Sequence, residues 1–192
     1  MKNNKINIHF LGAAGTVTGS KYLVDTGDRK ILIDCGLFQG LKELRLKNWE
    51  YPPVNVADID AVLLTHGHMD HTGYLPRLVK QGFNGPIYGT NPTLDIAKII
   101  LNDSAKIQEQ DAERANKEGY SKHSPAEPLY DLNDVEKTIP YFKGVPPSQW
   151  LPILKDVKAR FQYNGHILGA TYIELDIRGK RFVFSGDIGR TN

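Results

Sequence analysis

The sequence predicts an α/β fold in a single domain that spans residues 1–192. Short apolar runs, which are typical of buried strands, alternate with segments of helical periodicity. Three apolar runs lead to Asp34, His66 and Asp187, and a fourth is followed by His166. Because functional side chains at strand ends gather at one edge of a sheet, we expect these four residues to build one site.

Composition excludes few classes of function. The formal net charge is +2, from 24 basic and 22 acidic residues, so the composition alone predicts neither nucleic-acid nor membrane binding. The only cysteine is Cys35, which rules out an internal disulfide and favours a reducing, cytoplasmic location. No signal peptide and no apolar stretch long enough to cross a membrane is visible, so we expect no membrane partner.

The first half of the chain predicts five strands, at residues 6–11, 22–25, 30–34, 61–64 and 86–89. The second and third of these flank Gly27-Asp28, which is a hairpin turn signal. The glycine-rich stretch after the first strand ends in Gly19-Ser20-Lys21. This is not the Gly-Lys-Ser/Thr order of a phosphate-binding loop, so we expect a turn that joins two strands.

Helices are predicted at residues 72–81, 92–117 and 131–141. The first is expected to stop at Gly82 and to accept Pro76 only in its first turn. The second begins with Asn91 as the cap and proline at the first position, and its polar end, residues 108–118, is expected to project into solvent. Either Asp131 or Asn133 is expected to cap the third helix.

The last part of the chain predicts three strands, at residues 157–163, 171–177 and 181–184. The first of them leads into Gly165-His166, and the last ends in Ser185-Gly186-Asp187. The middle strand alternates between apolar and polar residues, which is typical of a sheet with one buried face.

Residues 65–71 contain most of the residues that are suited to bind a metal. Neutral imidazole and carboxylate are good ligands for zinc and similar metals. His66 and His68 share one face of an extended chain, whereas the adjacent Asp70 and His71 cannot aim at the same point. The economical solution is two metals side by side, one for each pair. A polar loop with chance histidines is disfavoured, because this loop holds half of the six histidines in the chain.

Each supporting residue also has a purely structural interpretation when it is taken alone. Asp34 is then a turn cap, Asp187 part of a solvated loop, and His166 a hydrogen-bonded core histidine. Taken together with the histidine loop, a shared metal site is favoured for all three. His123 lies in a polar stretch, and we expect it to be a surface histidine.

The motifs resemble those of the metallo-β-lactamase superfamily. The resemblance rests on His66-x-His68-x-Asp70-His71, the downstream His166 and Ser185-Gly186-Asp187. Within this superfamily, the chain resembles the β-CASP branch in particular. This closer resemblance rests on the sequences of residues 10–24, 32–40, 71–76 and 184–189. That branch contains RNA-processing nucleases, including bacterial ribonucleases and the endonuclease that processes mRNA 3′ ends.

The resemblance implies a four-layer αββα sandwich with two zinc ions. One zinc is expected to be held by His66, His68 and His166, the other by Asp70 and His71, and Asp187 is expected to bridge them. Asp34 matches a motif that supports the ligand loop without binding metal. Family members continue into an inserted β-CASP cap domain and return with further motifs, including a histidine proton donor. The chain is therefore expected to be the N-terminal portion of such an enzyme.

The function that the resemblance implies is a zinc-dependent RNA phosphodiesterase, a ribonuclease, in which a metal-bridging hydroxide attacks the phosphodiester. Asp70 or Asp187 would orient the hydroxide. A thioester or lactam hydrolase on the same fold, and a non-catalytic partner subunit, remain as alternatives. No basic patch interleaved with aromatic residues stands out, and we expect the cations at Lys155, Lys158, Arg160 and 178–181 to be solvated. An uncovered sheet also predicts association, as a homo-oligomer.

Overall fold

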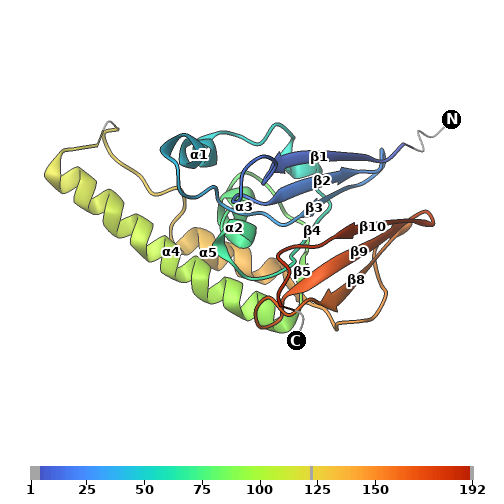
Figure 1. Ribbon diagram of the computed structural model, residues 1–192. Coiled ribbons are helices and arrows are strands. Elements are labelled where there is room, and N and C mark those ends of the chain that lie inside the picture. Colours follow the sequence, from blue (N-terminus) through green and yellow to red (C-terminus); the bar gives the residue numbers. More distant parts are fainter. Residues whose placement is uncertain (1–4, 122, 191–192) are drawn as a thin grey trace.

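The computed structural model describes residues 5–121 and 123–190, so the chain end at Asn192 lies outside the described residues. Its strands form a six-stranded sheet in the order β1-β2-β3-β4-β5-β6 and a four-stranded sheet in the order β10-β9-β8-β7. The two sheets face each other, and the helices lie on the far side of the first sheet (Figure 1). No helix in the described part of the chain is long and apolar enough to cross a membrane.

The first sheet is mixed. Its strands are β1 Asn7–Gly12, β2 Lys21–Asp25, β3 Lys30–Ile33, β4 Ala61–Leu63, β5 Ile87–Gly89 and β6 Phe142–Gly144. β1, β2 and β3 pair in antiparallel fashion, whereas β3, β4, β5 and β6 are parallel. The carboxyl ends of β3 and β4 therefore meet at one edge of the sheet, where Asp34 and the histidine loop follow them.

The second sheet is antiparallel throughout. Its strands are β7 Leu151–Leu154, β8 Val157–Tyr163, β9 Thr171–Ile177 and β10 Lys180–Phe184. The alternation in β8 and β9 places Val157, Ala159, Phe161, Ile173, Leu175 and Ile177 on one buried face. These residues pack against the apolar side chains of β2, β3 and β4, which include Val24, Ile31 and Leu63, and form the core between the sheets.

The helical layer comprises α1 Lys42–Leu46, α2 Met69–Thr72, α3 Leu75–Lys80, α4 Asn91–Glu118 and α5 Leu132–Thr138, with short 3₁₀ turns at Lys47–Trp49, Val56–Asp58 and Ile139–Tyr141. A second core lies between this layer and the first sheet. Leu32, Val62 and Leu64 contribute from the sheet, and Leu75, Leu78 and Leu101 from the helices. Alternate residues of the central strands thus enter opposite cores, as expected for strands that are buried on both faces.

The described residues supply three of the four expected layers: helix, sheet and sheet. No helix covers the outer face of the second sheet within residues 5–121 and 123–190 (Figure 1). β10 is the edge strand of that sheet, and Val183 on it is 60% exposed. For this part of the chain, the expected lack of a covering helix is confirmed for both strands around Thr171 and Phe182. The expected lack of a closing neighbour is confirmed for β10, which carries Phe182, but it was wrong for β9, which pairs with β8 and β10.

The predicted helix at 72–81 was wrong in its extent. The structure has two short helices instead, and α2 already begins inside the histidine loop at Met69. It begins there because the carbonyl oxygen of His68 accepts hydrogen bonds from the backbone N–H groups of His71 and Thr72, both at 3.0 Å. Pro76 lies in the first turn of α3, as expected.

The predicted cap of α4 was also wrong, because the cap is Thr90 and Asn91 is the first helical residue. The Thr90 hydroxyl accepts a hydrogen bond from the Thr93 N–H at 3.4 Å. The capping of α5 by Asp131 is confirmed, and Asp134 completes a capping box.

The polar end of α4 does not simply project into solvent. Gln108 and Glu109 accept hydrogen bonds from the backbone N–H groups of Leu129 and Leu132, at 3.1 Å each. Side chains of the expected solvent-facing half therefore hold the segment that leads into α5. Strands β6 and β7 were not predicted.

Candidate metal centre

The site begins where β3 and β4 end. Asp34 follows β3 with a φ of +57°, a left-handed conformation that aspartate tolerates better than most residues. Its backbone N–H donates to the Leu63 carbonyl at 2.9 Å, and its carboxylate accepts from the Thr65 N–H at 2.8 Å. Asp34 is 1% exposed. It therefore fixes the ends of both strands directly before the histidine loop.

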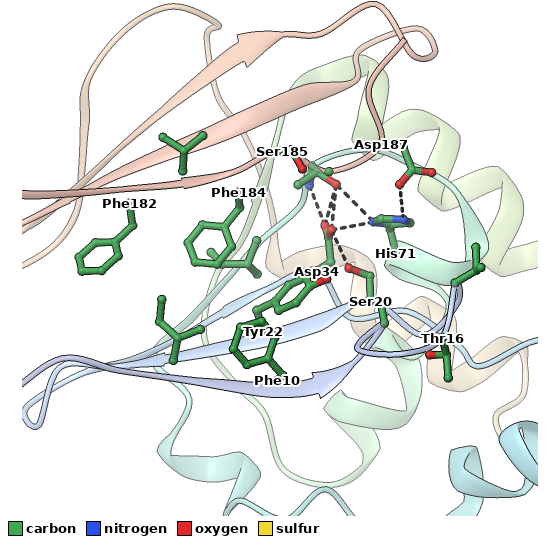
Figure 2. A pocket seen from close by; sticks show the side chains of 17 residues that line it. Phe10, Thr16, Ser20, Tyr22, Asp34, His71, Phe182, Phe184, Ser185 and Asp187 are labelled. Atoms are coloured by element: carbon green, nitrogen blue, oxygen red, sulfur yellow. Dashed lines mark hydrogen bonds and ion pairs between the residues drawn. The ribbon is translucent and has the colours of Figure 1, made fainter.

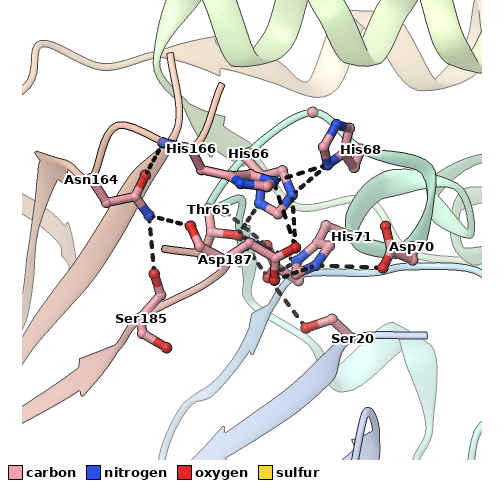
Figure 3. Close-up of polar contacts among 12 residues, drawn as sticks. Ser20, Thr65, His66, His68, Asp70, His71, Asn164, His166, Ser185 and Asp187 are labelled. Atoms are coloured by element: carbon pink, nitrogen blue, oxygen red, sulfur yellow. Dashed lines mark hydrogen bonds and ion pairs between the residues drawn. The ribbon is translucent and has the colours of Figure 1, made fainter. Parts of the chain in front are cut away.

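Three histidine nitrogens converge above this edge (Figure 3). The His68 Nδ1 atom lies 3.1 Å from His66 Nε2 and 3.2 Å from His166 Nε2. Two nitrogens bound to one tetrahedral zinc are about 3.3 Å apart, given Zn–N bonds of about 2.0–2.1 Å. The three atoms thus have the mutual spacing of a metal-ligand set. With Asp187, they form a cluster whose ligand atoms all lie within 4.8 Å of one another.

A second group lies beside the first. The His71 Nε2 atom is 3.8 Å from Asp70 Oδ2 and 3.4 Å from Asp187 Oδ1. The other oxygen of Asp187, Oδ2, lies 3.6 Å from His166 Nε2 and 3.9 Å from His66 Nε2. Each oxygen of the Asp187 carboxylate therefore faces a different group, so Asp187 stands between the two (Figure 3).

A buried network under the loop orients two of the histidines. His71 Nδ1 lies 2.7 Å from Asp34 Oδ2, and a carboxylate can only accept there. The proton of neutral His71 is therefore on Nδ1, and its Nε2 lone pair faces Asp70 and Asp187. The Thr65 hydroxyl lies 2.9 Å from Asp34 Oδ2 and 3.0 Å from His66 Nδ1. The Ser20 hydroxyl donates to Asp34 at 3.3 Å.

Burial sets the charge of the loop. Desolvation, helped by the nearby His71, lowers the pKa of His66 to about 3, so its imidazole is neutral, the form that binds metal. Burial also lowers the pKa of His71, but the carboxylates of Asp34, Asp70 and Asp187 together outweigh this effect, and the net direction is upward. A bound cation would reverse that preference, because it competes with the proton for the same nitrogen.

Backbone contacts hold the ligand loop against the glycine-rich segments. Ser20 N–H donates to the Asp70 carbonyl at 2.8 Å, and Cys35 N–H donates to the His71 carbonyl at 2.7 Å. At Gly36, a Cβ atom would lie 1.5 Å from the Asp70 carbonyl oxygen. Only glycine permits this approach, which explains why a glycine follows Asp34-Cys35.

His166 and Asp187 come from the second sheet, and Asn164 holds them together (Figure 3). Its amide nitrogen donates to the backbone carbonyls of Ser185 and Asp187, at 3.2 Å and 2.8 Å. Its amide oxygen accepts from the His166 N–H at 3.3 Å. The two loops also touch directly, because a Cβ atom on Gly189 would lie 2.1 Å from the Gly165 carbonyl oxygen.

A cleft of about 480 Å³ leads from the surface to this group. It opens between the edge strands β1 and β10, and Figure 2 shows the aromatic side chains of Phe10, Tyr22 and Phe184 along it. Asp34, His71 and Asp187 lie at its inner end.

All seven residues predicted for the site come together in the structure: Asp34, His66, His68, Asp70, His71, His166 and Asp187. His123 does not join them. It is exposed and lies beside Leu46 and Trp49 in another pocket, as expected of a surface histidine. Arg160 was expected to be solvated, but it pairs with Glu174 and lies over the Trp150 ring.

Three further residues of the site were missed: Ser20, Thr65 and Asn164. Thr65 directly follows a buried strand and precedes the first histidine, and Asn164 stands two residues before His166. Thr65 is therefore adjacent to a recognised ligand-type residue, and Asn164 is two positions from one. A hydroxyl or an amide carries no spacing signature of its own, however, and so neither was singled out.

The donor set fits divalent zinc or a similar metal. Imidazole nitrogens and carboxylate oxygens suit such ions, and a shared cation would account for three imidazole nitrogens that converge at hydrogen-bond distance on one point. His66, His68 and His166 supply three donors around one point, with Asp187 as a fourth.

Comparison with known proteins agrees with this geometry. Residues 14–192 match the sequence profile of the metallo-beta-lactamase superfamily. The chain is 35% identical over 178 residues to ribonuclease TTHA0252 from Thermus thermophilus, which covers 93% of this chain and 37% of that protein. It is 33% identical to transcription termination factor FttA from Methanocaldococcus jannaschii, over 95% of this chain and 27% of that protein. Integrator complex subunit 11 from Danio rerio is 29% identical, over 97% of this chain and 30% of that protein.

Among solved structures, the metallo-beta-lactamase fold protein YhfI from Bacillus subtilis superposes with a TM-score of 0.55 at 19% identity, covering 96% of this chain and 63% of that one. This likeness concerns the fold alone. The three relatives are β-CASP family members. The chain spans 27% to 37% of their lengths.

Proposed function

Since the chain belongs to the metallo-beta-lactamase superfamily, we propose that it carries the metal centre of a zinc-dependent ribonuclease of the β-CASP type. The observation that carries the proposal is the position of Asp187. Its two carboxylate oxygens face two separate groups of ligand-type atoms, as expected for a bridge between two metal ions a few ångströms apart. The name of the Thermus thermophilus relative, a ribonuclease, supports RNA as the substrate.

In this proposal one zinc is held by His66, His68 and His166, and the second by Asp70 and His71. Asp187 is shared by both. Two zinc ions in such a site supply a nucleophile at neutral pH and neutralise the charge that develops on the phosphate oxygens.

The chain's own residues prepare that site. Asp34 keeps the His71 proton on Nδ1 by accepting it at 2.7 Å, which leaves Nε2 free. Thr65 fixes His66 through its Nδ1 at 3.0 Å. The Asp187 side chain is 46% exposed and lies at the inner end of the cleft, so either it or Asp70 would orient the attacking water.

A proton donor for the leaving sugar oxygen is not evident in the described part of the chain. His71 is the only histidine that lines the cleft there, and it is committed to Asp34. General acid catalysis typically contributes about 10²–10⁴-fold. We therefore expect the 192-residue chain to cleave RNA at most at a trace of the rate of the longer relatives. A cytoplasmic location fits the proposal, because the free thiol of Cys35 is buried and unpaired with another cysteine.

The test is RNA turnover by the zinc-loaded chain, with the substitutions His68→Ala and Asp187→Asn. Both should abolish the trace of structured-RNA cleavage that we expect from wild type in an assay with excess protein, whereas His123→Ala on the exposed surface should leave it unchanged. A thioester and a lactam are assayed in parallel. Turnover of either, without RNA cleavage, would favour another hydrolase, and a chain that binds no metal would favour a non-catalytic subunit.

A further inference from the structure

A second concave surface lies between α1 and the middle of α4, outside the cleft that leads to the metal centre (Figure 1). We call it the α1–α4 groove, and its volume is about 660 Å³. Lys42, Arg45 and Trp49 line one wall, and Ser104 and Ile107 of α4 line the other.

The charge of the groove has one sign. Lys42 and Arg45 both line it and both are exposed, and no aspartate or glutamate is among the described residues of its lining. Neither cation forms an ion pair within residues 5–121 and 123–190, although other exposed cations of the chain do. Two unneutralised cations over a hollow surface favour an anionic ligand.

The groove also offers an aromatic face. Trp49 is 49% exposed and lies beside Leu46, which is 55% exposed. Indole rings that remain half exposed next to basic residues are suited to stack with the bases of a single strand. A duplex hides the faces of its bases, so a stacking ring favours single-stranded nucleic acid over a duplex.

One end of the groove lies close to the ligand loop. Met69 lines the groove, and in the sequence it stands between His68 and Asp70, one ligand-type residue from each group. The groove is therefore within reach of a strand whose scissile phosphate lies at the metal centre. Lys42, Arg45 and Trp49 lie within residues 42–49, so the expectation that no basic patch with an aromatic residue stands out is corrected here. The sequence does not reveal the hollow itself, because its other wall comes from α4.

From these observations we infer that the α1–α4 groove binds single-stranded RNA that flanks the scissile phosphate, with Lys42 and Arg45 on the backbone phosphates and Trp49 stacked on a base. The inference rests on the proposed function for the identity of the strand. It adds a binding surface that is separate from the metal ligands, so the two can be tested apart.

The experiment measures binding rather than cleavage. The anisotropy of a short, fluorescein-labelled oligouridine is titrated with the full chain in buffer that contains a chelator, at several salt concentrations. Loss of two phosphate contacts in the Lys42→Gln, Arg45→Gln double variant should weaken binding and reduce the slope of log K against log salt by about 1.4. Lys155→Gln with Lys158→Gln, two exposed cations on the second sheet, is the matched control and should leave the slope unchanged.

The stacking contact is tested with Trp49→Leu, which should weaken binding by about 5- to 150-fold. Tyr51→Leu is its control, because Tyr51 is even more exposed, at 78%, but lies outside the groove. Thermal melting of each variant checks that the fold is retained. If Trp49→Leu does not melt like wild type, Trp49→Gln replaces it, with the same expected loss of binding.

The outcomes separate this inference from the proposed function. If groove variants bind the oligonucleotide like wild type, the inference is wrong, even if His68→Ala abolishes cleavage. If they lose binding while the chain binds no zinc in a metal titration, the inference stands and the proposed function fails. If they change self-association in sedimentation but not RNA affinity, the groove is a protein interface and the inference is overturned.

Discussion

His71 Nδ1 and Asp34 Oδ2 are 2.7 Å apart, and the two residues are 5% and 1% exposed at their side chains. This contact links the end of β3 to the loop after β4. It commits one nitrogen of His71 to the protein and directs the other toward Asp70 and Asp187. Asp34 thereby decides which atom of a ligand-type residue faces the site.

We predict that Asp34→Ala lowers zinc affinity by about 10- to 100-fold, the typical loss when such a supporting partner is removed. Competition with a chromophoric chelator measures the affinity. Asp34→Asn, which keeps the shape and tolerates the φ of +57°, should lose less, and the exposed Asp58→Ala should lose nothing. Equal zinc affinity in all three variants would mean that Asp34 is only a turn residue.

The two groups should differ in their affinity for zinc. His66, His68 and His166 supply three protein donors, the usual number for an open catalytic site, whereas Asp70 and His71 supply two besides the shared Asp187. We therefore predict one tight and one weaker site. His68→Ala should remove the tight one, and Asp70→Ala only the weaker. Two equally tight sites in a zinc titration would contradict this assignment.

The exposed edge of β10 should promote association. Among the described strands, β10 has no partner on its outer side. Its backbone groups, next to Val183 and to Phe10, which is 66% exposed, form a surface that favours strand pairing. We predict concentration-dependent self-association in sedimentation velocity, and less of it for Val183→Lys, since charge on an edge strand opposes pairing. A chain that stays monomeric at all concentrations would contradict this prediction.

Lys21 predicts a pH dependence of stability. Burial lowers its pKa from 10.5 to about 8, while burial raises the pKa of the nearby Cys35 to about 12. The unfolded chain therefore holds a proton on Lys21 between pH 8 and 10.5 that the folded chain has lost. Stability from this group is present above pH 10.5 and is lost as the pH falls from 10.5 to 8.

The comparison that isolates this effect is wild type against Lys21→Met in chelator. Between pH 8 and 10.5, the free energy of unfolding of wild type should rise relative to the variant by an amount on the order of 3 kcal/mol. The rings of Phe38 and Tyr74, 4.6 Å and 4.9 Å from the Lys21 amine, favour the charged form of Lys21. They therefore offset part of this change in the free energy of unfolding. The free energies of unfolding are measured by urea denaturation. If they change with pH in parallel for wild type and Lys21→Met, Lys21 is charged in the folded protein.

Much of the fold was predictable because its strands are strongly patterned. β8 and β9 have the predicted bounds, since β8 alternates between apolar and polar residues along its length and β9 does so from Ile173 to Ile177, which is typical of a strand with one buried face. β6 is only three residues long, and β7 contains Pro152, so neither shows a strand pattern. The start of α2 depends on the His68 carbonyl, which no local sequence signal reveals.

The site was predictable where side-chain chemistry is distinctive. Histidines and aspartates at strand ends indicate a candidate metal site, and all seven predicted residues come together in the structure. Asn164 acts through backbone carbonyls of a loop that lies far along the chain. Its role depends on the packing of two loops, which the sequence does not display.

The most direct test of the metal centre is anomalous diffraction at the zinc edge from crystals of the zinc-loaded chain. We expect two peaks on either side of the Asp187 carboxylate. The first should lie about 2.0–2.1 Å from His66 Nε2, His68 Nδ1 and His166 Nε2, and the second at a similar distance from His71 Nε2. A peak that leaves out His66 or His166, or the absence of any peak beside Asp187, would contradict the assignment.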